Sequence, residues 1–535
     1  MRGARRVARR WRLRRVAVAA TLAATMLASP AASAFDLTKV RIDLRPLFDA
    51  QVEGEPAAEA LFGATVVADL TGDGRKEIVL PGTDGRLRLL RLTGSQRKPN
   101  LTPWAIVDTS VEGDRWSGGC YLTAAALQKG APASLVLALP RGIFTVRIEG
   151  EPPSPQWAPF CDRTFFDPSQ AGSGPRRLDF LVDLDGDGTP EIWTPQIEGM
   201  AFLRRRKSRE APVPTGPTWE EVQKPSLSLR ARQSVGASPV RLSAVQSPLY
   251  ALRLGHTLSF PTLRVTDLDS DGRGELVVLT RETVTQPSTL RAECFALRDA
   301  LHFTTSPSQV RAAPMGRGSQ TFLDLNGDGF LDLLRVESNL DIVSPRTAIE
   351  VFLSPPAPEH TFEQPTSRYT THDPIGMVLY GDWNGDRMID LAYSQFDYTF
   401  GSTDDLVDLI VGREIPVTVR FLYGSASGFA AKSDQDLRLE IRNRCFHYRF
   451  FPPVSMEGDY NGDGISDLLV RSRLERYEIH LSQDGGRRLS RRPVESFSVA
   501  AESVCRVADL DGDGRSDLLE FEPGRPAITV LLSRP

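Results

Sequence analysis

Short apolar runs recur along the whole of this 535-residue chain, and they are rich in Val, Ile and Leu. Runs such as 66–68 and 78–80 are too short for amphipathic helices, whereas 87–92, 349–354 and 477–482 alternate apolar with polar residues. Both patterns are typical of strands that are buried on one or both faces. The pattern therefore predicts an all-β protein built from many short strands.

A nine-residue acidic loop separates two apolar runs in most of these units, and it occurs seven times. Its fullest form is Asp-x-Asp-x-Asp-Gly-x-x-Asp/Glu, and the copies span residues 69–77, 183–191, 267–275, 324–332, 382–390, 459–467 and 509–517. A hairpin turn needs one Asp or Gly, but three or four close carboxylates repel one another by roughly 1 kcal/mol or more per pair. The repetition therefore predicts cation sites rather than simple turns.

Calcium is the expected cation, because it prefers six to eight oxygen ligands and tolerates irregular geometry. Positions 1, 3, 5 and 9 would offer side-chain oxygens, position 7 its carbonyl, and glycine at position 6 permits a positive φ. The flanking runs are strands, so the loop is not an EF-hand. Up to seven Ca²⁺ sites are predicted, with these ligands: Asp69, Asp73, Arg75 and Glu77; Asp183, Asp185, Asp187, Thr189 and Glu191; Asp267, Asp269, Asp271, Arg273 and Glu275; Asp324, Asn326, Asp328, Phe330 and Asp332; Asp382, Asn384, Asp386, Met388 and Asp390; Asp459, Asn461, Asp463, Ile465 and Asp467; Asp509, Asp511, Asp513, Arg515 and Asp517.

Two copies of the loop depart from the pattern. The first has Thr71 at position 3, which is a weaker neutral ligand. The fifth has Arg387 where glycine is expected, so its turn should be strained or differently shaped.

The spacing of the loops predicts a ring of repeats. The first interval, 114 residues, is twice a basic period of about 57, and residues 123–147 align with 64–88 without any acidic ligand. This gives eight repeats of about four short strands, as in a closed β-propeller, with seven blades as the alternative. The last repeat stops at Pro535 after its third strand, so residues 39–45 are expected to supply its fourth.

These features resemble the FG-GAP/VCBS repeats of the integrin α-subunit propeller and its bacterial relatives. Phe62-Gly63 precedes the first loop and Leu80-Pro81-Gly82 follows it, where the family has Gly-Ala-Pro. The resemblance covers about residues 60–535. It implies calcium in the loop between the first and second strands of a blade, and commonly seven blades.

The N-terminus predicts export. Residues 1–15 carry eight Arg, an apolar stretch follows at 16–27, and Ala32-Ser33-Ala34 is a small-residue cleavage site. Residues 1–34 are therefore expected to be a signal peptide, and 35–535 a single secreted or periplasmic propeller with insertions at about 204–259 and 394–444. No other apolar run is long enough for a transmembrane segment in the mature chain.

The net charge, the cysteines and the histidines bear on which partners and which kinds of catalysis the sequence allows. Cleavage would move the net charge from −4 to −12, from 56 basic and 68 acidic residues, which argues against nucleic acid as a partner. Five cysteines leave at least one unpaired; Cys120 with Cys161 is the first pair to test, although both could equally be buried small hydrophobes. The six His are scattered, and no HExxH or GxSxG motif is present.

Two functions remain open on the sequence. The favoured one is a calcium-stabilised scaffold that binds or adheres to a protein or glycan ligand. The alternative is an enzyme, because some calcium-bearing propellers of similar repeats are polysaccharide lyases with a basic and aromatic face. The shape and lining of the central face would discriminate between them.

Overall fold

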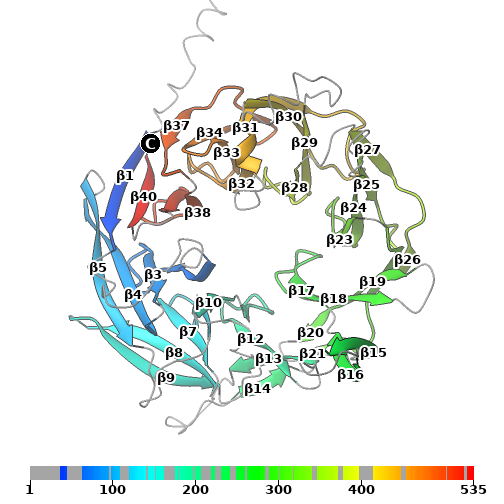
Figure 1. Ribbon diagram of the computed structural model, residues 1–535, viewed down its shortest axis with the longest axis horizontal. Coiled ribbons are helices and arrows are strands. Elements are labelled where there is room, and N and C mark those ends of the chain that lie inside the picture. Colours follow the sequence, from blue (N-terminus) through cyan, green and yellow to red (C-terminus); the bar gives the residue numbers. More distant parts are fainter. Residues whose placement is uncertain are drawn as a thin grey trace, which may run out of the picture.

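The computed structural model shows eight blades arranged in a closed ring, the architecture of an eight-bladed β-propeller (Figure 1). It describes most of residues 36–534. The longer stretches outside the description are 45–62, 109–119, 162–174, 206–218, 223–229, 241–248, 283–287, 341–345, 372–376, 397–413, 447–452 and 523–526, together with both chain ends and the expected signal peptide. The preferred blade count is confirmed and the seven-bladed alternative is wrong.

Each blade is an antiparallel sheet whose strands follow one another in sequence from the ring axis outward (Figure 1). The strands of blades one to four are β2 (Val66–Ala68), β3 (Glu77–Pro81), β4 (Arg86–Ser95), β5 (Lys98–Asp108); β6 (Cys120–Ala126), β7 (Ala133–Leu139), β8 (Gly142–Glu149), β9 (Ser154–Cys161); β11 (Leu181–Val182), β12 (Glu191–Gln196), β13 (Gly199–Arg205), β14 (Trp219–Val222); and β17 (Thr262–Thr266), β18 (Glu275–Glu282), β19 (Thr289–Phe295), β22 (Gln309–Pro314).

Blades five to eight follow the same order. Their strands are β23 (Ser319–Leu323), β24 (Asp332–Asn339), β25 (Arg346–Phe352), β27 (Ser367–Thr371); β28 (Val378–Gly381), β29 (Asp390–Phe396), β30 (Glu414–Leu422), β31 (Gln435–Arg442); β32 (Val454–Gly458), β33 (Asp467–Arg473), β34 (Arg476–His480), β37 (Glu495–Ser498); and β38 (Val504–Ala508), β39 (Asp517–Phe521), β40 (Ala527–Arg534), β1 (Asp36–Asp43). Blade two, which carries no acidic loop, confirms the degenerate repeat expected at 123–147.

The N-terminal strand closes the ring, as predicted, although it begins slightly earlier than the expected 39–45. β1 pairs antiparallel with β40 over its whole length, from Asp36 opposite Arg534 to Asp43 opposite Ala527, so the first and the last described strands lie side by side (Figure 1). Val40 and Leu44 are buried in the core between blades eight and one. The exposed edge that β40 would otherwise present is thereby covered.

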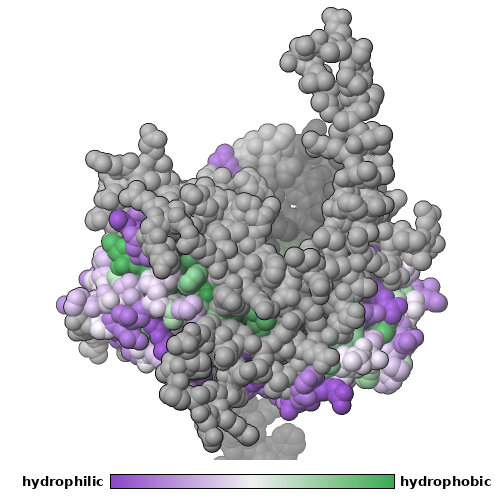
Figure 2. Space-filling view, turned by 90° about the horizontal axis from the view of Figure 1, so that it is seen from below, coloured by the Kyte–Doolittle hydropathy of each residue, from purple (hydrophilic) through white to green (hydrophobic). Residues whose placement is uncertain are grey.

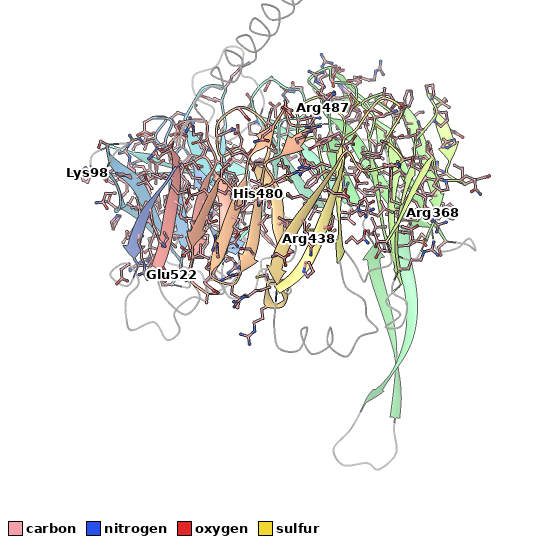
Figure 3. All side chains as sticks on the ribbon, turned by 90° about the horizontal axis from the view of Figure 1, so that it is seen from above. Lys98, Arg368, Arg438, His480, Arg487 and Glu522 are labelled. Atoms are coloured by element: carbon pink, nitrogen blue, oxygen red, sulfur yellow. The ribbon has the colours of Figure 1, made fainter. Side chains whose placement is uncertain are left out.

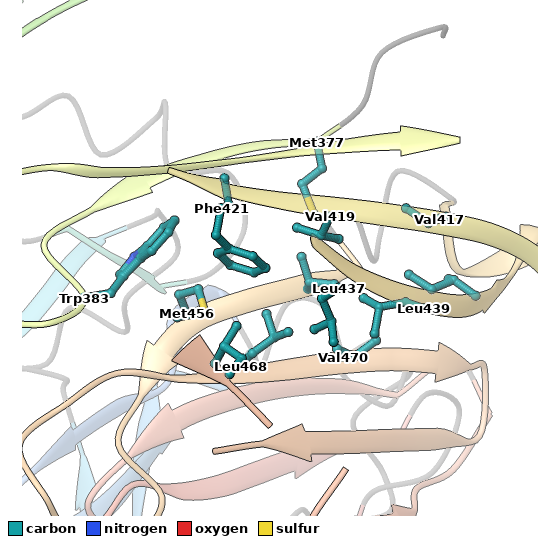
Figure 4. Close-up of a cluster of buried hydrophobic side chains, with 14 of the residues drawn as sticks. Met377, Trp383, Val417, Val419, Phe421, Leu437, Leu439, Met456, Leu468 and Val470 are labelled. Atoms are coloured by element: carbon teal, nitrogen blue, oxygen red, sulfur yellow. The ribbon is translucent and has the colours of Figure 1, made fainter. Parts of the chain in front are cut away.

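Apolar side chains between facing blades form the core. The middle strands are buried on both faces because each blade stacks on two neighbours. Figure 4 shows one such layer between blades six and seven, where Trp383, Phe421, Leu437 and Val470 are all at most 6% exposed. Because successive side chains of a strand point to opposite faces, the unbroken apolar runs of the middle strands, such as 78–80, pack against both neighbours.

Several short elements lie outside the regular blades. They are β10 (Pro175–Arg177) beside β6, β26 (Glu359–Thr361) beside β22, the hairpins β15 (Arg230–Val240) with β16 (Leu249–Ser259), β20 (Leu297–Asp299) with β21 (His302–Phe303) and β35 (Ser482–Gln483) with β36 (Arg488–Leu489), and the 3-10 helix η2 (Asn443–Phe446). The β15–β16 hairpin belongs to the segment 204–259 and projects from one side of the ring (Figure 3). Of the segment 394–444, residues 414–442 contain the blade strands β30 and β31, so its extra length lies in 397–413, outside the described residues.

A Cys120–Cys161 disulfide does not fit this topology. Cys120 begins β6 and Cys161 ends β9, at the inner and outer edges of the same blade. Three strand spacings separate them, about 14 Å, which is about twice the longest Cα separation that a disulfide bridges. Cys294, Cys445 and Cys505 are free thiols, and Cys294 and Cys445 are buried.

Candidate metal loops and central cavity

The seven acidic loops occupy equivalent places in seven blades, between the first and second strands. This is where the repeat resemblance expects them. In blade two the corresponding connection, residues 127–132, joins β6 to β7. The ring therefore carries its loops on the axis side of every blade except the second.

The first aspartate holds each loop in a closed turn. In blade eight, the backbone N–H of Gly512 donates to Oδ1 of Asp509 at 2.8 Å, and that of Gly514 donates to Oδ2 at 3.2 Å. The bond from position 6 to the first aspartate recurs in all seven loops. The loops are therefore wrapped around their own carboxylates.

The fifth position is equally fixed. Its Oδ1 accepts the N–H of the residue at position 7, for example that of Arg515 on Asp513 at 3.0 Å and that of Thr189 on Asp187 at 2.7 Å. The second carboxylate oxygen then points away from this backbone contact. In three blades, oxygens of the loop acids lie within 4.8 Å of one another: Asp183, Asp185 and Glu191; Asp267, Asp269 and Asp271; Asp509, Asp511 and Asp517.

The ninth-position acid is the most buried member of each loop. One of its oxygens accepts the N–H of the residue at position 2, at 2.7–3.1 Å in all seven loops. The seven acids are at most 6% exposed: Glu77, Glu191, Glu275, Asp332, Asp390, Asp467 and Asp517. Each of the seven loops therefore has a buried carboxylate at its base.

Burial raises the pKa of these acids, and the other carboxylates of the loop add to the shift, although the backbone N–H opposes it. The pKa is about 7 for Glu77, Glu191, Glu275, Asp332 and Asp467, about 6 for Asp390 and about 8 for Asp517. Such groups hold protons in the folded chain that the unfolded chain has released. Carboxylates shifted in this direction need a compensating charge at neutral pH.

The stability of the protein is expected to respond to pH in opposite directions with and without calcium. Without a cation, the raised pKa values mean that stability is lost as pH rises through about 6–8 and regained as pH falls toward 5. With calcium, protons compete with the cation, so stability falls as pH is lowered over the same interval. Melting temperatures from pH 8 to 5, in EGTA and in millimolar calcium, measure both slopes, and slopes of the same sign would contradict this prediction.

The donor set fits a hard divalent cation. In blade four, carboxylate oxygens of Asp267, Asp269 and Asp271 lie within 4.8 Å of one another, and Glu275 is buried in the same loop. No ion pair to these four acids is found in the part of the chain that the structure describes. Elsewhere, Oε1 of Glu77 and Oδ1 of Asp511 are buried without a hydrogen-bond partner. Oxygen donors at this charge density are those that calcium prefers.

The two atypical loops keep the common shape. Arg387 has φ +69°, the left-handed conformation that glycine takes in the other loops, and its N–H still donates to Asp382 at 2.9 Å. The turn is therefore strained but not reshaped. Because position 3 is Thr71, the first loop has one carboxylate fewer than the full copies.

Each loop is also a joint between blades, which the sequence did not predict. In five of the seven loops the residue at position 8 donates its N–H to a backbone carbonyl of the adjacent loop: Lys76 to Leu510, Gly274 to Leu184, Ile389 to Leu325, Ser466 to Trp383 and Ser516 to Asp459, at 2.6–3.0 Å. In the other two, position 8 is Pro190, which has no N–H, and Leu331, which donates to Oε1 of Gln309. Ala133 of blade two donates to Asp69 in the same way at 2.8 Å. We call this series of inter-loop bonds the inner hoop. Only the fold brings the loops into register, so no local motif could have revealed it.

A cavity of about 1280 Å³ opens on the axis side of blades three to six. Its wall includes acidic residues of three loops, among them Asp269, Asp324 and Asp386, together with Arg264 and Arg387. The loops therefore line this cavity as well as joining blades. Its lining contains no His, Tyr or Lys among the described residues.

Comparison with known families decides the repeat type. The model of the FG-GAP-like repeat matches residues 459–520, which include the loops of blades seven and eight. The chain is an FG-GAP repeat β-propeller. No curated protein matches this propeller in sequence.

Solved structures resemble this FG-GAP propeller only distantly. An Agrocybe aegerita lectin, described as recognising non-reducing terminal N-acetylglucosamine, is 15% identical with a TM-score of 0.38, over 72% of this chain and 83% of the lectin. Saccharomyces cerevisiae Sqt1 is 8% identical with a TM-score of 0.33, over 93% and 98%. BBS1N in complex with ARL6DN is 9% identical with a TM-score of 0.28, over 88% and 92%. Similarities of this degree carry no argument about function.

No helix among the described residues of the FG-GAP propeller is long and apolar enough to cross a membrane. On the face seen in Figure 2, the described residues are mostly hydrophilic, and the hydrophobic residues form small groups. The exposed large hydrophobic residues are Ile106, Tyr380 and Val494, from three different blades or their connections.

Proposed function

We propose that this FG-GAP propeller is a calcium-stabilised binding scaffold of the secreted or periplasmic space, and that a protein or glycan ligand binds at the cavity of blades three to six. A propeller with FG-GAP repeats fits a binding or scaffold role. The observation that carries the proposal is the cavity wall, which is made of the same acidic loops that join the blades.

Calcium would act in this scaffold through the loops. The side chains at positions 1, 3, 5 and 9 would hold it, and it would neutralise carboxylates that are otherwise forced together at the inner hoop. Because the loops bond to one another, neutralising one also strengthens the joint with the next blade. When no cation is bound, backbone N–H groups of the loop still hold the carboxylates in their orientation.

The cavity lining supports binding over the lyase alternative. A lyase of the kind considered on the sequence is expected to have a basic and aromatic face, whereas the charged groups of the described lining are mostly acidic around Arg264 and Arg387, and the lining includes no His, Tyr or Lys. Acidic loops carrying a cation would instead suit hydroxyl or carboxylate groups of a glycan or an acidic peptide. The leader-like residues 1–34 support export.

Chelation is expected to lower the melting temperature. At about millimolar calcium each occupied site adds about 1 kcal/mol, so several sites together correspond to a loss on the order of 5 °C for a chain of this length. Calorimetry of the purified mature protein in EGTA and in calcium, with metal analysis of the same sample, tests this. Identical melting curves together with a metal-free protein would refute the calcium part of the proposal.

Ligand binding is tested on a glycan array and on immobilised acidic peptides, with and without calcium. Binding should require calcium and should weaken in Arg264→Ala, whose side chain lines the cavity. Arg438→Ala is the matched control, because Arg438 lies on β31, away from that cavity (Figure 3). Equal loss in both variants would place the ligand elsewhere.

A further inference from the structure

Arginine side chains reach into three of the acidic loops, and the one in blade three is the most complete. Nη1 of Arg204 lies 2.6 Å from Oδ2 of Asp185, Nη2 lies 2.8 Å from Oδ2 of Asp187, and Nε lies 3.7 Å from Oε1 of Glu191. These three acids are the side chains at positions 3, 5 and 9. The guanidinium is 7% exposed, so it lies within the loop rather than on its surface.

Blades one and eight hold similar contacts. Arg91 lies 2.6 Å from Asp73 and 3.6 Å from Glu77, at positions 5 and 9 of the first loop. Arg534 pairs with Asp511 and lies 3.7 Å from Asp513, at positions 3 and 5 of the last loop. In the described parts of the loops of blades four to seven, no arginine ion pair to the loop carboxylates is found.

The strand register explains how the arginines arrive. Ile78 pairs with Leu90 and Ile192 with Leu203, which puts Arg91 and Arg204 beside the glutamates at position 9. Side chains directly opposite one another on antiparallel strands share a face, so a long cationic side chain at the next pair reaches the loop. In blade four Leu276 pairs with Phe295, and the same register puts Ala296 opposite Glu275.

Blades three and four thus form a natural comparison within one chain. Both loops read Asp-x-Asp-x-Asp-Gly-x-x-Glu and offer the same four carboxylates. Blade three has an arginine at the facing position, and blade four has an alanine there. The difference in available positive charge comes from this one position on the third strand.

We propose that Arg91, Arg204 and Arg534 are built-in cations of their loops, so that added calcium loads the loops of blades four to seven first. The arc of blades eight, one, two and three, which contains the ring closure, then holds together without metal. The arc of blades four to seven, which carries most of the cavity wall, depends on it. The selectivity for calcium rests on the proposed function, whereas the role of the arginines as counter-ions does not.

The reciprocal substitutions Arg204→Ala and Ala296→Arg test this in the full mature chain. In EGTA, Arg204→Ala should lower the melting temperature, because three carboxylates lose their counter-ion, and Ala296→Arg should raise it. In calcium titrations by calorimetry, the wild type should bind about four equivalents tightly. Arg204→Ala should gain one tight equivalent, and Ala296→Arg should lose one, each through at least a tenfold change in affinity.

Arg291→Ala is the matched control, because Arg291 lies on the third strand of blade four but pairs with Glu293 on that strand at 2.9 Å and not with a loop carboxylate. It should change neither readout. A merely structural role of Arg204 would lower stability without adding a calcium equivalent, which would overturn the proposal. Seven equal sites in the wild type, unchanged by either substitution, would also overturn it while leaving the calcium scaffold intact. If no variant binds calcium, the proposed function fails, and the two melting shifts in EGTA still decide the arginine role.

Discussion

Replacing Val40 by aspartate is expected to open the ring and to cost about 3 kcal/mol or more of folding free energy. Val40 is 8% exposed on β1, where it packs with Ile528, Val530 and Leu532 of the last blade. A carboxylate there has no partner and disrupts the strand that covers β40 in blade eight. Urea unfolding and limited proteolysis of the mature protein measure the loss, and cleavage should begin at the two chain ends.

Lys39→Gln is the control for this prediction. Lys39 is the neighbouring exposed residue on β1, and its ammonium donates to the Ser498 carbonyl at 3.3 Å. Its replacement should change stability by no more than about 0.5 kcal/mol. If Val40→Asp were as mild as Lys39→Gln, β1 would not be needed for closure.

The second large effect is expected from Gly512→Ala in the loop of blade eight. Gly512 has φ +76°, and a Cβ at this position would lie 2.1 Å from the carbonyl oxygen of Gly74 in blade one. The backbone of the neighbouring loop would have to shift, and with it the bond from Lys76 to Leu510 in the inner hoop. Thermal unfolding should show a loss well above the cost of positive φ alone.

Gly514→Ala separates the two causes within the same loop. Gly514 has φ +84°, but a Cβ at this position would meet nothing within 4 Å, so this variant carries the backbone strain without the clash. Strain of this kind costs about 1–2 kcal/mol. Gly512→Ala should cost at least about twice as much, and equal losses would mean that the contact between blades eight and one is unimportant.

The sequence was a good guide wherever the structure is local and repeated. The loop spacing and the apolar periodicity predicted the blades, including blade two without its acids, and the truncated last repeat predicted the role of β1. The contacts between repeats could not be predicted from the sequence. The inner hoop depends on backbone groups that every residue carries, and Arg204 meets Glu191 only through a register that the sequence does not state.

The expected Cys120–Cys161 pair shows the same limit of prediction from sequence. Cys120 and Cys161 border the same repeat and lie close in sequence, which made a crosslink plausible. Because successive strands step outward from the axis, residues at the start and end of one blade lie at its opposite edges. Proximity along the chain therefore does not imply proximity in a propeller blade.

The pairing of β1 with β40 also sets the order of assembly. β1 precedes the other blade strands in the sequence, and its partner β40 follows all of them. Until β40 has been synthesised, β1 has no pairing partner, and the first and last blades cannot yet close the ring. A nascent or exported chain of this kind would need its earliest strand kept from pairing with other molecules. Folding of the ring would end in a single step, when β40 pairs with β1.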